Sequence, residues 1–174
     1  MSRWLTILPL VVLAGLGVLF ATYGLHHNPQ VQPHALVGKP VPDVTLPSLD
    51  DGTPVKVRDL VKDGPVIINF FASWCAPCEV EAPVLMQMKA NGVRMVGIAY
   101  KDDPAKTQAF LGRLGDPFAG RLVDRDGAAG IEFGVTGVPE TYLVGADGII
   151  RDKHTGPLEE ADAKALAARM LTSR

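Results

Sequence analysis

Residues 65–78 read PVIINFFASWCAPC, and no other stretch of the chain indicates its fold so directly. The part that ends at Phe71 is almost entirely apolar, as expected of a central β-strand that is covered on both faces. It leads straight to Cys75 and Cys78, which are the only cysteines of the chain. A Cys-x-x-Cys pair at the end of a strand, with Trp74 before it and a proline inside it, is typical of a dithiol that opens and closes.

Three other uses of the pair fit the sequence less well. A structural bridge would close so small a loop that it would barely restrain the unfolded chain. A zinc site needs two further ligands, and the globular region offers only His34 and His154, which are far apart in sequence. Haem attachment needs a histidine directly after the second cysteine, where this chain has Glu79. The sequence therefore favours reversible dithiol chemistry.

The two cysteines are expected to play different parts. A disulfide exchanges by attack of a thiolate, so one of them has to ionise near neutral pH. Cys75 is expected just before a helix, close to free backbone amides and to the positive end of the helix dipole. Cys78 is expected inside the first turn, where it is shielded. We therefore assign Cys75 as the attacking sulfur and Cys78 as the resolving sulfur.

The N-terminal segment indicates where this chemistry takes place. From Leu5 to Leu25 the chain has 21 residues without a charge, enough to cross about 30 Å of hydrocarbon as a helix. Arg3 precedes this segment and no further Lys or Arg follows until Lys39, so the N-terminus is expected in the cytoplasm. A cleaved signal peptide is the alternative, but its apolar region is usually shorter, and Ala21-Thr22-Tyr23 is a poor cleavage site.

The sequence thus predicts a transmembrane anchor at residues 1–25, a linker at 26–40 and a periplasmic domain at 41–174. The protein is expected to be a single-pass protein of the inner (cytoplasmic) membrane. Its 174 residues, 47% of them apolar, suit one globular domain plus the anchor. The net charge is −2, and the exported part, which lacks Arg3, has a net charge of −3. This charge disfavours a nucleic-acid partner.

The domain is expected to combine short β elements with alternating strands and helices. Strands are predicted at 44–46, 55–57, 66–71, 93–99, 141–144 and 149–151. Helices are predicted at 104–114, at 158–171 and directly after the dithiol, with Pro77 in the first turn. In the helix after the dithiol, the residues expected to face the core are Val80, Val84, Leu85 and Met88. Pro83 is expected to kink this helix. Asp102 and Asp103 are expected to cap the next helix rather than bind a metal.

With the dithiol between the first strand and the first helix, the predicted elements follow the order β-α-β-α-β-β-α along the chain. Four motifs lie within this order: Trp74-Cys75-Ala76-Pro77-Cys78-x-x-Glu81, Tyr100-Lys101-Asp102-Asp103, Leu114-Gly115-Asp116-Pro117-Phe118 and Gly134-Val135-x-Gly137-Val138-Pro139-Glu140-Thr141. Over about residues 35–170, the set resembles the membrane-anchored thiol:disulfide interchange proteins of bacterial cytochrome c maturation (the CcmG/DsbE type). The resemblance implies an α/β thioredoxin-like fold with extra N-terminal β elements, preceded by one transmembrane helix.

The resemblance also implies roles for residues around the dithiol. Glu81 and Glu140 match acidic residues that the family places at its active site. A like charge there raises the pKa of a thiolate, which makes the pair a better electron donor. Trp74 is expected to act as a lid over the first cysteine, with simple packing as the alternative, and Pro77 belongs to the same group of tuning residues.

The bond between Val138 and Pro139 is expected to be cis. In the thioredoxin fold this loop faces the dithiol, and the backbone of Val138 would pair there with an extended substrate segment. Ordinary thioredoxins also carry a buried carboxylate six residues before the first cysteine. This chain has Asn69, which cannot titrate, so proton transfer has to use another group such as Glu81 or water.

The function implied by the resemblance is the reduction of a disulfide in the Cys-x-x-Cys-His segment of apocytochrome c, directly or through another cytochrome c maturation protein. The electrons would come from a membrane thiol carrier of the CcdA/DsbD type, and the chemistry needs no cofactor and no metal. Two other classes stay open. One is a general exported thiol reductase or oxidant, and the other is a non-enzymatic module that holds apocytochrome or carries a metal.

Overall fold

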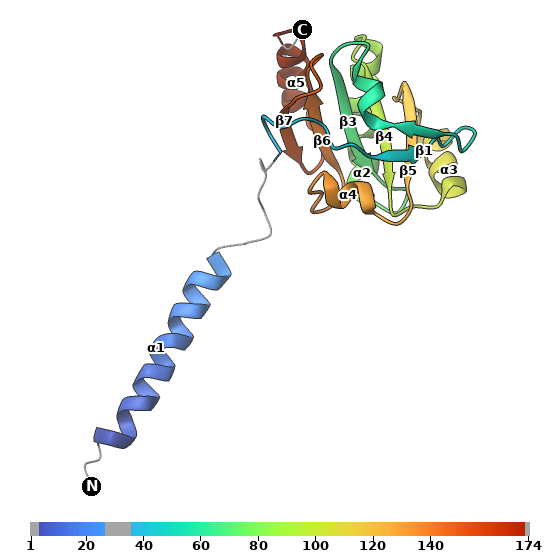
Figure 1. The fold of residues 1–174 in the computed structure, drawn as a ribbon. Helices are drawn as coiled ribbons and strands as arrows, with labels where there is room; N and C mark the ends of the chain where they lie inside the picture. The colour runs from blue at the N-terminus through green and yellow to red at the C-terminus, as the bar shows by residue number, and fades with distance from the viewer. Residues whose placement is uncertain (1–3, 27–35, 173–174) are drawn as a thin grey trace. The chain divides into compact units, whose positions relative to one another are not determined.

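The computed structural model of the chain describes residues 4–26 and 36–172. The chain divides into two compact units, residues 1–32 and 33–174. In the first unit, helix α1 (Trp4–His26) contains the whole uncharged segment (Figure 1). Judged by length and hydropathy together, none of the helices within the described ranges qualifies as a membrane span. Residues 27–35 of the predicted linker lie outside the described residues.

A five-stranded sheet forms the centre of the second unit, in the order β5-β4-β3-β6-β7. All six residues of the middle strand β3 (Val66–Phe71) are buried, as its apolar sequence predicts. β3 is parallel to β4 and antiparallel to β6, while β5 is parallel to β4 and β7 is antiparallel to β6. The bounds of these four strands are Met95–Tyr100 for β4, Gly120–Asp124 for β5, Glu140–Val144 for β6 and Ile150–Thr155 for β7.

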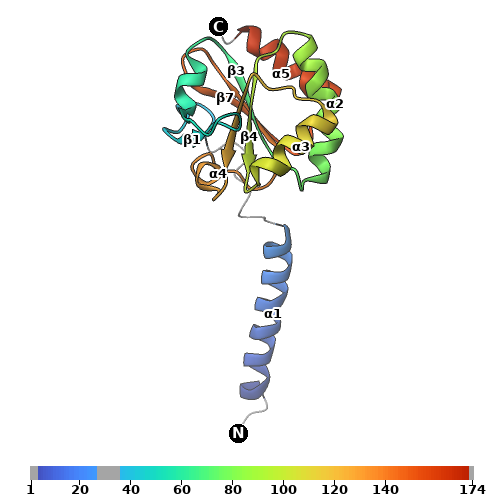
Figure 2. The same ribbon diagram turned by 90° about the vertical axis from the view of Figure 1, so that its right-hand side faces the viewer.

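Different elements cover the two faces of the sheet, as Figure 2 shows. Three helices, α2 (Ala76–Ala90), α3 (Pro104–Leu114) and α5 (Glu160–Thr172), pack on the face that holds Ile67 and Leu143. The opposite face, which holds Ile68 and Tyr142, is covered by β1 (Thr45–Pro47), β2 (Pro54–Lys56), the 3-10 helix η1 (Val57–Val61) and α4 (Ala128–Glu132). Successive strand residues point to opposite faces, so the sheet separates two apolar cores.

The predicted α/β organisation is confirmed, but three elements were missed, namely β5, α4 and η1. β5 is a short edge strand that begins with Gly120 and Arg121, so it has no apolar run to reveal it. α4 has five residues, which is too short for a helical period to show in the sequence. The N-terminal hairpin was predicted, although Val57 begins η1 instead of ending the return strand.

The face that helix α2 buries was predicted in part, since Leu85 and Met88 are buried and Val84 is partly buried. Its buried residues are Cys78, Glu81, Ala82, Leu85 and Met88. The prediction for Val80 is wrong, because 73% of this residue is exposed. With 3.6 residues per turn, a face centred on Leu85 points Val80 to the solvent. Pro83 lies within α2, which continues past it to Ala90.

Candidate active site

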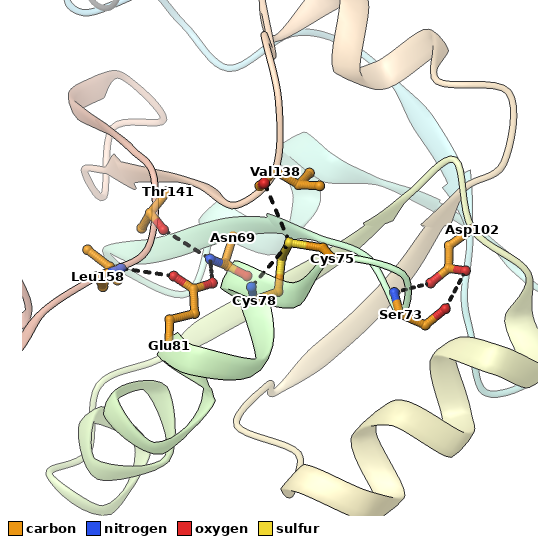
Figure 3. Close-up of a disulfide and its surroundings, with 9 residues drawn as sticks. All are labelled: Asn69, Ser73, Cys75, Cys78, Glu81, Asp102, Val138, Thr141 and Leu158. Atoms are coloured by element: carbon orange, nitrogen blue, oxygen red, sulfur yellow. Dashed lines mark hydrogen bonds between the residues drawn. A yellow bond between two sulfur atoms is a disulfide. The ribbon is translucent and has the colours of Figure 1, made fainter.

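The two cysteines form a disulfide at the start of α2 (Figure 3). Cys75 is the N-cap of the helix, and Cys78 lies in its first turn. The backbone N–H of Cys78 donates to Cys75 Sγ over 3.1 Å. Cys75 is 4% exposed and Cys78 only 2%, so Cys75 is the more accessible of the two sulfur-bearing residues. Pro77 is tolerated in this first turn, because an amide there has no partner inside the helix.

A buried carboxylate holds the loop that leads to the disulfide. Asp102 follows β4, and its side chain accepts hydrogen bonds from the backbone N–H of Ser73 (2.6 Å) and from Ser73 Oγ (2.8 Å). Asp103 alone caps α3, accepting from the N–H of Ala105 over 3.0 Å. The predicted capping role is therefore correct for Asp103, whereas Asp102 joins the dithiol loop to the end of β4.

Trp74 lies on the surface, with 60% of it exposed. Its indole Nε1 donates to the carbonyl oxygen of Lys101 over 3.2 Å. The indole ring is thus hydrogen-bonded to the segment after β4, one residue before Asp102, which binds Ser73.

The loop before β6 approaches the disulfide from the other side. The Val138–Pro139 peptide bond is cis, as predicted. The carbonyl oxygen of Val138 lies 3.4 Å from Cys75 Sγ (Figure 3). The structure therefore brings the predicted substrate-binding backbone directly to the first sulfur.

Glu81 lies in the core, on the side of the sheet that α2 covers. It accepts hydrogen bonds from Asn69 Nδ2 (3.0 Å) and from the backbone N–H of Leu158 (3.1 Å). Burial raises its pKa from 4.5 to about 7, although both hydrogen bonds favour the ionised form and oppose this shift. Glu81 is therefore able to gain or lose a proton near neutral pH.

A small cavity lies beside Glu81 and Cys78. It has a volume of about 10 Å³, close to the space that one water needs, and its lining includes Asn69, Cys78 and Glu81. Asn69 donates to Glu81 and to Thr141 Oγ1, but its Oδ1 is buried and has no partner among the described residues. Glu81 and the resolving cysteine thus border the same small, mostly apolar cavity.

Glu140 lies on the opposite face of the sheet from Glu81. Glu140 and Tyr142 are two residues apart on β6, so both lie on the face that η1 and α4 cover. Its carboxylate is completely buried and forms an ion pair with Lys153 Nζ at 2.9 Å. The structure therefore does not bring the two predicted acidic residues together, because they lie on opposite faces of the sheet. The charge of Glu140 is also compensated by Lys153.

Two residues of this region, Asp102 as a loop anchor and Lys153 as a buried cation, were not found from the sequence. An acidic residue directly after a strand was visible, but nothing local pairs it with Ser73, which lies 29 positions earlier. Lys153 falls beyond the predicted strand 149–151, in a segment of mixed polarity.

Comparisons with known proteins agree with this geometry. The Redoxin family model matches residues 36–168. The thiol:disulfide interchange protein DsbE of Allochromatium vinosum is 40% identical over 88% of this chain and 84% of its own. HelX of Rhodobacter capsulatus, also a thiol:disulfide interchange protein, is 40% identical over 92% of this chain and 91% of its own.

A solved structure shows the same fold. The secreted Mycobacterium tuberculosis disulfide oxidoreductase homologous to E. coli DsbE superposes with a TM-score of 0.63 and 27% identity, over 72% of this chain and 96% of that one. The predicted thioredoxin-like fold is thereby confirmed for the second unit. The chain is a thiol-disulfide oxidoreductase of the redoxin family and belongs, within that family, to the thiol:disulfide interchange proteins of the DsbE and HelX type.

Proposed function

We propose that this protein is a reductant, held at the outer face of the cytoplasmic membrane, that opens the disulfide in the Cys-x-x-Cys-His segment of apocytochrome c, directly or through a partner. The observation that carries the proposal is the cluster around the disulfide. Cys75 stands at a helix N-terminus with the backbone of Val138 beside it, and Cys78 shares a cavity with Glu81.

The reaction begins with the reduced dithiol. The Cys75 thiolate attacks one sulfur of the target disulfide, forms a mixed disulfide and releases the other target sulfur as a thiolate. Cys78 then loses its proton and attacks Cys75 Sγ, which releases the second target sulfur. The target gains two electrons, and Cys75 and Cys78 end as the disulfide seen in the structure. A membrane thiol carrier of the CcdA/DsbD type would restore the dithiol.

Helix geometry supports Cys75 as the attacking group. As the N-cap, its sulfur already accepts the N–H of Cys78 and lies at the positive end of the α2 dipole, and both effects favour a thiolate. Cys78 is covered by the helix and reaches only a sulfur that is already bonded to Cys75, as a resolving group requires.

Glu81 is proposed as the proton acceptor for Cys78. With a pKa of about 7, it is partly ionised at neutral pH and can take a proton across the small cavity that both residues line. Its negative form also disfavours a second negative charge on the dithiol, which supports a reducing role. Because Lys153 compensates Glu140, we assign this tuning to Glu81.

Val138 is proposed to bind the backbone of the target. A segment that lies extended beside the cis-proline loop can pair with it as an added strand, which brings a target sulfur within reach of Cys75. Residues 1–25 are proposed as the membrane anchor, with the catalytic domain in the periplasm. The support for this is the uncharged segment from Leu5 to Leu25, preceded by Arg3.

A trapping experiment tests the proposed function. In a Cys78→Ser variant the mixed disulfide cannot be resolved, so targets stay bonded to Cys75 and can be identified after purification under non-reducing conditions. We expect apocytochrome c or a protein of its haem-assembly machinery. The matched control is Cys75→Ser, which should trap neither. Recovery of a broad set of unrelated exported proteins instead would contradict the assignment and indicate a general reductase.

A further inference from the structure

Lys153 is the only lysine or arginine that is buried in the part of the chain that the structure describes. It lies on β7, and its side chain is 4% exposed. Burying an ammonium group is costly unless it is paired and hydrogen-bonded. The partners that Lys153 contacts therefore indicate what its charge is used for.

The Lys153 ammonium group joins a carboxylate to a loop. Nζ lies 2.9 Å from Glu140 Oε2 and donates to the carbonyl oxygen of Gly134 over 2.8 Å. It also lies 5.3 Å from the centre of the Tyr142 ring. Gly134 belongs to the segment between α4 and β6, residues 133–139, which we call the proline loop.

Glu140 holds the same loop at a second point. Its Oε1 accepts hydrogen bonds from the backbone N–H of Thr136 (3.0 Å) and from Thr136 Oγ1 (2.6 Å). The Tyr142 hydroxyl lies 3.0 Å from Glu140 Oε2 and 2.9 Å from the carbonyl oxygen of Phe133, so it lies between the carboxylate and the start of the loop.

The other end of the proline loop lies at the dithiol. Val138 is two residues beyond Thr136, and its carbonyl oxygen is 3.4 Å from Cys75 Sγ. The contacts of Glu140 and Lys153 thus fix the part of the loop that precedes Val138, while neither charged group bonds to a cysteine in the described structure.

We propose that Lys153 is a positioning residue for the exchange reaction, and that it acts through Glu140 to hold the proline loop in the conformation that binds an extended target segment. This inference rests on the proposed function, since it assumes a target that pairs with Val138. A buried ion pair is weak evidence for stability, because apolar replacements of such pairs are often neutral or stabilising. The convergence of both side chains on one substrate-facing loop supports a positioning role.

Kinetics of the reduced full-length protein test the inference with two disulfide probes, the first turned over at steady state with a thiol reductant that restores the dithiol and the second reduced in a single turnover. One is a short oxidised peptide that contains Cys-x-x-Cys-His, and the other is dithiodipyridine, which is too small to pair with a strand. In Lys153→Met we expect KM for the peptide to rise about tenfold, the effect of losing one or two hydrogen bonds, with little change in kcat. The rate with dithiodipyridine should stay unchanged. Glu140→Gln, which keeps an acceptor for Thr136, should raise KM less.

The control is Arg151→Met on the same strand, which removes an exposed ion pair with Asp147 and should leave all rates unchanged. A KM for the peptide that equals that of the unaltered protein in both test variants overturns the inference, even if their unfolding midpoints fall, because the ion pair is then only structural.

If Lys153→Met does not fold, the KM of Glu140→Gln alone decides in the same way. If the unaltered protein does not reduce the peptide, the proposed function fails and this inference with it, whereas normal turnover with unchanged variants contradicts this inference alone.

Discussion

Glu81 shows how one buried side chain links stability to chemistry. Most carboxylates of this chain are exposed, but Glu81 is 1% exposed and its only described hydrogen-bond donors are Asn69 Nδ2 and the N–H of Leu158. The desolvation that raises its pKa makes it a proton carrier near neutral pH. The same desolvation means that ionising Glu81 weakens the folded state.

The first prediction concerns the pH dependence of stability. The pKa of Glu81 is about 7 in the folded protein and near 4.5 when the chain is unfolded, so the folded state holds this proton more tightly. Its contribution is complete below about pH 4.5 and is lost as the pH rises through 7. The difference corresponds to about 3 kcal/mol. We expect urea unfolding to show this loss between pH 4.5 and 8 in the unaltered protein and not in Glu81→Gln.

The control for this prediction is Glu79→Gln on the same helix. Glu79 is exposed, and the hydrogen bond from Arg113 lowers its pKa, so its removal should leave the loss at rising pH in place. Equal pH profiles for Glu81→Gln and the unaltered protein would show that Glu81 does not titrate in this range.

At the scale of elements, α2 and β7 show where sequence patterns succeed and where they fail. The start of α2 was predicted from Pro77, because the chemistry of a helix start is local. The buried face of α2 was predicted only in part. The helix is apolar on both sides, with exposed Val80 opposite buried Leu85, so the pattern alone did not distinguish the two faces.

β7 was predicted only for its beginning, and a bulge explains why its buried lysine escaped notice. Val144 pairs with Ile150 and Tyr142 with Lys153, so the register shifts by one residue at Arg151. Simple alternation from Ile150 would point Lys153 away from the core that Ile150 joins. The extra residue reverses this, and Lys153 reaches Glu140.

The second prediction belongs to α2. Val80→Lys should change the free energy of unfolding by less than about 0.5 kcal/mol, because it replaces an exposed side chain. Leu85→Ala, on the opposite face, should cost about 2–5 kcal/mol, because it leaves a cavity in the core between α2 and the sheet. Denaturant unfolding at a single pH measures both. Comparable losses in the two variants would mean that α2 packs through another face.

At the scale of the whole molecule, both apolar cores lie in the second unit. The two clusters of buried residues begin at Val41 and Leu49, within residues 33–174. Backbone hydrogen bonds also attach the first described residues of the second unit to β7. The Gly38 N–H donates to Ile150 O over 2.8 Å, and the Ile150 N–H donates to Lys39 O over 2.9 Å. The second unit thus has its own apolar cores.

The third prediction follows from this division. A chain that starts at Pro33 should unfold at the same urea concentration as the full-length protein and should exchange disulfides with dithiodipyridine at the same rate. If residues 1–25 are the anchor, the shortened chain should also leave the membrane fraction, in which the full-length protein is expected. A shortened chain that stays with the membranes would contradict the proposed anchor, and one that unfolds earlier would contradict the independence of the second unit.

The features that could be predicted from the residues themselves are local ones: the apolar strand β3, the adjoining Cys75 and Cys78 and the helix after them. Each depends on residues that are neighbours along the chain, whereas the cis bond before Pro139 was expected from the family resemblance. The partners of the buried charges were decided only by the tertiary structure. Asp102 meets Ser73, and Lys153 meets Glu140, across separations that no local pattern spans, and the second contact also depends on a bulge that turns one strand residue over.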